Sequence, residues 1–124
     1  MNPTRLTITL QSDWRSALRN AARRATEGLS DGTYQGERLN FESPGAFFGK
    51  LTEGRWAIIH ALQAEAGEIA VRELARRLGR DVKRVHADVC ALAELGLVER
   101  SASGGLLCPF ADIHVDMHLS TRAA

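Results

Sequence analysis

Residues 71–100 read VRELARRLGRDVKRVHADVCALAELGLVER, and the spacing of their apolar side chains decides the fold. From Val71, apolar residues recur at positions i, i+3, i+4 and i+7, which predicts a short amphipathic helix that ends at Gly79. A second helix is expected to begin at Asp81, a good N-capping residue, and to end at Gly96. Two helices joined by so short a turn have the rhythm of a helix-turn-helix.

The segment after the second helix predicts a β-hairpin. LVERSASGGLLC, at residues 97–108, has two short apolar and polar runs on either side of a polar tip that contains glycine. Ile69, which precedes the first helix, is expected to pair with this hairpin as a third strand. Two helices followed by such a wing predict a winged helix-turn-helix. The core side of the second helix is expected to comprise Val82, Val85, Val89, Leu92 and Leu95.

The first forty residues predict a strand, a helix and a second strand. Residues 5–10, RLTITL, alternate apolar and threonine side chains, as a half-buried strand does. Ser12 can cap a helix that is expected to end near Gly28, and residues 37–42 alternate again. The order strand, helix, strand follows from these three patterns.

Two further helices and a last strand complete the expected organisation. A helix is expected to start at Ser43 and Pro44, and another is expected from Thr52 until a left-handed stop at Gly67. Residues 113–119 alternate as a final strand, and the three outer strands are expected to share one small sheet. The predicted fold class is α+β. The expected domains are an N-terminal strand-helix-strand at residues 1–42, a winged helix-turn-helix at 43–108, and a C-terminal strand and tail at 109–124.

The distribution of charge indicates a nucleic-acid partner. The chain has 16 basic and 15 acidic residues and a net charge of +1, but residues 72–86 hold six bases against two acids. Such a basic block is typical of a phosphate-binding surface, although it also occurs on a solvated helix face. Major-groove contacts are expected near the start of the second helix. The predicted DNA-binding residues are Arg72, Arg76, Arg77, Arg80, Lys83, Arg84, Ala87, Arg100 and Ser103.

Other chemistry has little support in the sequence. His114, Asp116 and His118 share one face of the last strand and could bind zinc, but the polar outer face of a strand has the same pattern. Cys90 and Cys108 could sense oxidants, yet a free cysteine is more often a small buried apolar side chain. No nucleophile with its base, phosphate-binding glycine loop or carboxylate pair occurs. We therefore expect no enzyme activity, no cofactor and no metal.

The sequence also limits the compartment. The first ten residues lack the apolar core of a signal peptide, and no apolar run is long enough to span a membrane. Two cysteines without a CxxC pair fit a reducing environment. The protein is expected to be cytoplasmic.

Residues 74–100, LARRLGRDVKRVHADVCALAELGLVER, resemble the MarR-like winged-helix regulators. With TITL near the start, LNFES at 39–43 and CPFADIHVDMHL at 108–119, the chain looks more like the DNA-binding antitoxins encoded beside TumE-type toxins. The resemblance implies a transcriptional regulator that represses its own operon and neutralises a toxin. We therefore expect an operator-binding homodimer with a cognate toxin as partner. A stand-alone repressor that responds to a small molecule or oxidant is the main alternative, and an adaptor module without DNA affinity is another.

Overall fold

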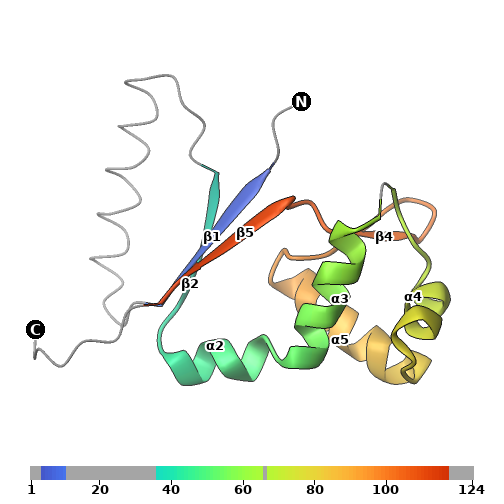
Figure 1. The fold of residues 1–124 in the computed structure, drawn as a ribbon, viewed down its shortest axis with the longest axis horizontal. Coiled ribbons are helices and arrows are strands. Elements are labelled where there is room, and N and C mark those ends of the chain that lie inside the picture. Colours follow the sequence, from blue (N-terminus) through green and yellow to red (C-terminus); the bar gives the residue numbers. More distant parts are fainter. Residues whose placement is uncertain (1–3, 11–35, 66, 118–124) are drawn as a thin grey trace, which may run out of the picture. The chain divides into compact units, whose positions relative to one another are not determined.

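A computed structural model describes residues 4–10, 36–65 and 67–117 of the chain (Figure 1). These residues divide into two compact units. The first unit contains the described residues up to Phe48 and those from Asp112 onwards, and the second contains those between Gly49 and Ala111. The second unit is therefore inserted in the sequence of the first. Four helices and five strands in the described residues confirm the α+β class.

The first unit contains a three-stranded parallel sheet. Its strands are β1 (Arg5–Leu10), β2 (Glu37–Phe41) and β5 (Asp112–Asp116), in the order β2-β1-β5. Leu6 of β1 lies opposite Glu37 of β2 and Ile113 of β5. The prediction that the three outer strands share one sheet is confirmed.

The central strand β1 is buried on both faces, so the expectation of a half-buried strand was wrong. Leu6 and Ile8 are 3% and 0% exposed, while Thr7 and Thr9 on the other face are 8% and 7% exposed. The Thr9 hydroxyl donates to Asn40 Oδ1 of β2 at 2.9 Å, which satisfies one of these buried polar groups. A central parallel strand is commonly covered on both sides, and threonine tolerates this position because its hydroxyl can find a partner.

Helix α2 (Pro44–Lys50) begins where the sequence predicted. The Ser43 hydroxyl accepts a hydrogen bond from the Ala46 N–H at 3.1 Å, as an N-capping side chain does. Phe47 is buried and meets Phe41 edge to face, with ring centroids 5.5 Å apart. This aromatic pair fixes α2 against the end of β2.

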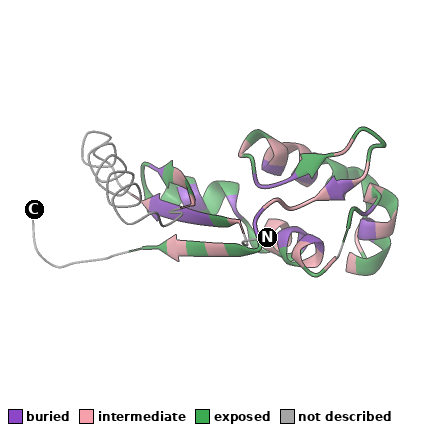
Figure 2. Cartoon of the chain, turned by 90° about the horizontal axis from the view of Figure 1, so that it is seen from above, coloured by how far each residue is buried: buried purple, intermediate pink, exposed green. Residues whose placement is uncertain are grey.

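The second unit packs three helices around one apolar core. They are α3 (Glu53–Gln63), α4 (Val71–Leu78) and α5 (Val82–Glu94), and the buried side of each appears in purple in Figure 2. Ala75 is 2% exposed, and its small side chain allows α4 and α5 to approach closely. The buried side chains of the three helices are Ile58, Ile59, Leu62, Leu74, Ala75, Val85, Val89 and Leu92.

A short antiparallel hairpin follows α5. It pairs β3 (Glu99–Arg100) with β4 (Leu106–Leu107). Ile69 and Leu106 exchange both backbone hydrogen bonds, at 2.9 and 2.8 Å, so the predicted third strand is confirmed as a single bridge. The hairpin is thereby tied to the segment that leads into α4.

Two local predictions about the helices were wrong. Helix α3 ends at Gln63, with Ala64 in the right-handed region, and Gly67 does not have a positive φ. Val82 is 37% exposed although it was expected in the core, because it is the first residue of α5 and precedes the turn that packs. Leu95 is half-buried at the other end of the same stripe.

The predicted helix from Ser12 to Gly28 lies outside the described residues. Among the residues that are described, no helix combines the length and the apolarity needed to cross a membrane.

Gly79 ends α4 in the left-handed region, with a φ of 65°, and offers a test of this fold. Nothing lies within 4 Å of a Cβ added at Gly79 or at Gly67, so the two positions differ in backbone conformation rather than in space. We expect Gly79→Ala to lower the free energy of unfolding by about 1 kcal/mol, because a side chain disfavours the left-handed region. Gly67→Ala should leave it unchanged or slightly raised. Urea unfolding followed by circular dichroism measures both, and equal losses would contradict this account.

Candidate nucleic-acid interface

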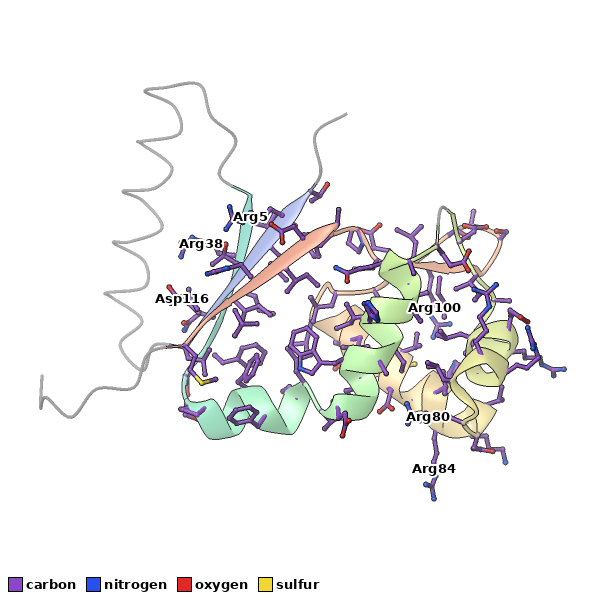
Figure 3. All side chains as sticks on the ribbon, in the orientation of Figure 1. Arg5, Arg38, Arg80, Arg84, Arg100 and Asp116 are labelled. Carbon is purple, nitrogen blue, oxygen red and sulfur yellow. The ribbon has the colours of Figure 1, made fainter. Side chains whose placement is uncertain are left out.

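The first turn of α5 carries two exposed basic side chains. Asp81 caps the helix, and its carboxylate accepts a hydrogen bond from the Arg84 N–H at 3.2 Å. Because Val85 is fully buried on one side of the helix, Lys83 and Arg84 are turned outward. Arg84 projects away from the helices in Figure 3. Neither side chain forms an ion pair with another described residue.

Acidic neighbours neutralise two of the three arginines on α4. Arg76 forms a bidentate ion pair with Glu73, which lowers the pKa of Glu73 and raises that of Arg76. Arg77 pairs with Glu65 and lies 3.5 Å from Glu73. Arg72 is exposed and has no ion pair within the described part of the chain. Arg72 is therefore the α4 arginine whose charge is least compensated.

The structure directs Arg80 into the unit. Its guanidinium donates to Asp88 Oδ2 at 2.7 Å, and Arg55 of α3 donates to Asp88 Oδ1 at 3.0 Å (Figure 3 shows Arg80). The exposed fraction of the side chain is only 29% for Arg80, 18% for Asp88 and 21% for Arg55. Arg80 Nη1 also approaches the Gly54 carbonyl oxygen at 3.5 Å. We call this group the Asp88 clamp, and it joins α3, the turn before α5 and the middle of α5.

Opposing effects act on the ionisation of Asp88. Partial burial disfavours the charged carboxylate, but the hydrogen bonds and charges of Arg80 and Arg55 outweigh this effect. The pKa of Asp88 is consequently held below its ordinary value of 3.8. Asp88 is thus a carboxylate that stabilises the packing of two helices.

The predicted hairpin contacts have partners within the unit. Arg100 Nη2 lies 3.4 Å from His86 Nε2 and 3.4 Å from Cys90 Sγ, so this guanidinium rests against α5. The Ser103 hydroxyl donates to Glu68 at 2.6 Å, and Ser101 and Ser103 together lower the pKa of Glu68. An acidic side chain therefore lies at the hairpin tip.

The remaining predicted residues are Ala87 and the zinc candidates. Ala87 is exposed on α5. His114 and Asp116 are exposed on β5, and His118 lies outside the described residues. Within the described ranges, no three His, Cys, Asp or Glu side chains form a group that could hold a metal.

A family model matches residues 50–115, just over half of the chain. The chain belongs to the HVO_A0114 family. The HVO_A0114 match includes α3, α4, α5, the hairpin and the whole Asp88 clamp, and the family description names no activity. No curated protein and no solved structure matched the chain. The resemblance to MarR-like regulators and to TumE-associated antitoxins stays a prediction.

The sequence pattern alone does not indicate the roles of Arg55, Glu65 and Glu68. Arg55 binds Asp88 from 33 residues away, and Glu65 binds Arg77 from 12 residues away. Only the unusual position of Asp88, an acid on the basic side of a helix, signalled that it needed a partner.

The pH dependence of stability tests the clamp. At neutral pH, we expect Asp88→Asn to lower the free energy of unfolding by about 2 kcal/mol, because two largely buried guanidinium groups lose a charged acceptor. A depressed pKa in the folded state gives stability that is present above pH 3.8 and is lost as the pH falls through the folded-state value. The difference between wild type and Asp88→Asn should therefore shrink in acid.

Glu94→Gln is the matched control, since Glu94 is an exposed acid of the same helix. It should have little effect at any pH. A loss in Asp88→Asn that stays constant down to acid pH would show that the carboxylate charge is not what stabilises the unit.

Proposed function

We propose that residues 49–111 are a winged helix-turn-helix that binds double-stranded DNA, and that the protein is a transcriptional regulator. The observation that carries this proposal is the pair Lys83 and Arg84. Both are exposed in the first turn of α5 and have no acidic partner among the described residues. In a helix-turn-helix, the start of the second helix contacts base edges in the major groove.

The ion pairs of the other basic residues also favour the first turn of α5 as the centre of the DNA interface. Arg76 and Arg77 are compensated by Glu73 and Glu65, and Arg80 is held by Asp88. Uncompensated positive charge therefore gathers on Lys83, Arg84 and Arg72. Phosphate contacts from such residues supply most of the affinity, while a guanidinium near the groove floor can read guanine.

The hairpin contributes less in this proposal than the sequence alone predicted. Glu68 at its tip would repel phosphates, and Arg100 would have to leave α5 to reach them. We propose that α5 provides most of the contacts and that Ser103 and Arg100 lie at the edge of the interface.

The oligomeric state, the antitoxin role and the response to an effector remain predictions. A homodimer would place two copies of α5 on a palindromic operator. An antitoxin would in addition bind a toxin through some other surface, and a stand-alone repressor would respond to an effector.

A double substitution tests the interface. Lys83→Ala with Arg84→Ala should weaken binding to a duplex of the region upstream of the protein's own gene by about tenfold or more, since each base contact contributes about 1 to 3 kcal/mol. Fluorescence anisotropy measures the affinity. Arg76→Ala with Arg77→Ala is the control, because it removes the same charge from side chains that already have acidic partners. Equal losses in both variants would mean that only net charge matters.

Salt dependence provides a second test. Affinity of the wild type should fall steeply as salt rises, because each neutralised phosphate releases counterions. The slope of log affinity against log salt should become shallower in the Lys83 and Arg84 double variant by about one for each phosphate contact that it removes. Absence of binding to any duplex at low salt would refute the proposed function.

A further inference from the structure

Three side chains of chemical interest meet beside the second half of α5. Cys90 and His86 lie one turn apart, with Cys90 Sγ 3.9 Å from His86 Nδ1. Arg100 of β3 reaches over from the hairpin, and its Nη2 atom lies 3.4 Å from the sulfur and 3.4 Å from His86 Nε2. We call these three residues the Cys90 cluster.

The contacts define the tautomer of His86 in this arrangement. A guanidinium can only donate, so His86 Nε2 accepts from Arg100 only when that nitrogen carries no proton. The proton of the neutral ring is then on Nδ1, the atom that faces Cys90 Sγ. Two N–H groups, from Arg100 and His86, are therefore directed at one sulfur.

Cys108 provides the contrast within the same chain. Burial raises the pKa of Cys108, a hydrogen bond with the Phe110 backbone lowers it, and the charge of Glu99 raises it. The Cys108 thiol lies 3.4 Å from the Phe110 carbonyl oxygen, to which it donates, and its charged neighbour is acidic rather than basic. Both cysteines are free and partly exposed.

We infer that the Cys90 cluster is a thiol modification site that reacts with hydrogen peroxide and related small oxidants. Reactive cysteines occur in partly exposed, electropositive surroundings, which the guanidinium of Arg100 provides for Cys90 and which Cys108 lacks. This inference does not depend on DNA binding.

The reaction is a two-electron oxidation of sulfur. Cys90 Sγ attacks one peroxide oxygen, an S–O bond forms and the O–O bond breaks. The thiol becomes a sulfenic acid, while the departing hydroxide takes the proton released by the thiol and leaves as water. The N–H groups of Arg100 and His86 that face the sulfur can donate to the departing oxygen, on which negative charge develops.

Trapping of the sulfenic acid tests this site in the full-length protein. After brief exposure to hydrogen peroxide with dimedone, mass spectrometry of peptides should show Cys90 labelled about tenfold faster than Cys108. Cys90→Ser should abolish that label, and Cys108→Ser should leave it intact. Equal labelling of the two cysteines, or faster labelling of Cys108, would overturn the inference.

Replacement of Arg100 tests whether the Cys90 cluster, rather than exposure of the thiol alone, makes Cys90 reactive. Arg100→Gln should slow labelling of Cys90 severalfold, and Arg72→Gln, which removes an equal charge from the exposed side of α4, should not. His86→Gln is a second variant that leaves the hairpin unaltered. Circular dichroism checks the fold of each variant, and unchanged labelling in both folded cluster variants would refute the roles of Arg100 and His86.

Discussion

The carboxylate of Asp88 links α3 and α5 of the inserted unit with the turn between α4 and α5. It receives Arg55 from α3 and Arg80 from the turn before α5, so one side chain fixes two connections at once. Apolar packing of Val85, Val89 and Leu92 sets which side of α5 faces the core. The two guanidinium groups add a directional restraint, because hydrogen bonds to a carboxylate have a preferred direction.

The Asp88 clamp also shows that some basic residues stabilise the fold, while others are left to bind a ligand. Six basic residues between positions 72 and 86 look equivalent in the sequence, yet their partners differ. Arg80 stabilises the unit, Arg76 and Arg77 bind nearby acids, and Arg72, Lys83 and Arg84 remain on the surface without an acidic partner among the described residues. A basic block is therefore a weaker indication of a ligand surface than the subset of its residues that acids leave uncompensated.

Local patterns predicted most of the described elements, because periodicity and capping act over a few residues. Asp81, Thr52 and Gly79 occupy the helix ends that their chemistry favours. The predictions were wrong where residues elsewhere in the chain determine the local structure. The hydroxyl of Thr9 finds its partner on Asn40, 31 residues later, and the inward turn of Arg80 depends on Asp88, eight residues later. Gly67 had the right residue type for a helix stop, but α3 had already ended at Gln63.

The insertion of one unit in the sequence of the other determines the order in which the chain can fold during synthesis. β1 pairs with β5 through partners such as Arg5 and Asp112, which are more than a hundred residues apart. A ribosome releases all of residues 49–111 before it releases β5, so the inserted unit can acquire its core while one edge of β1 still lacks its neighbour. Such long-range parallel pairing forms slowly, and a strand edge that waits can pair with another chain.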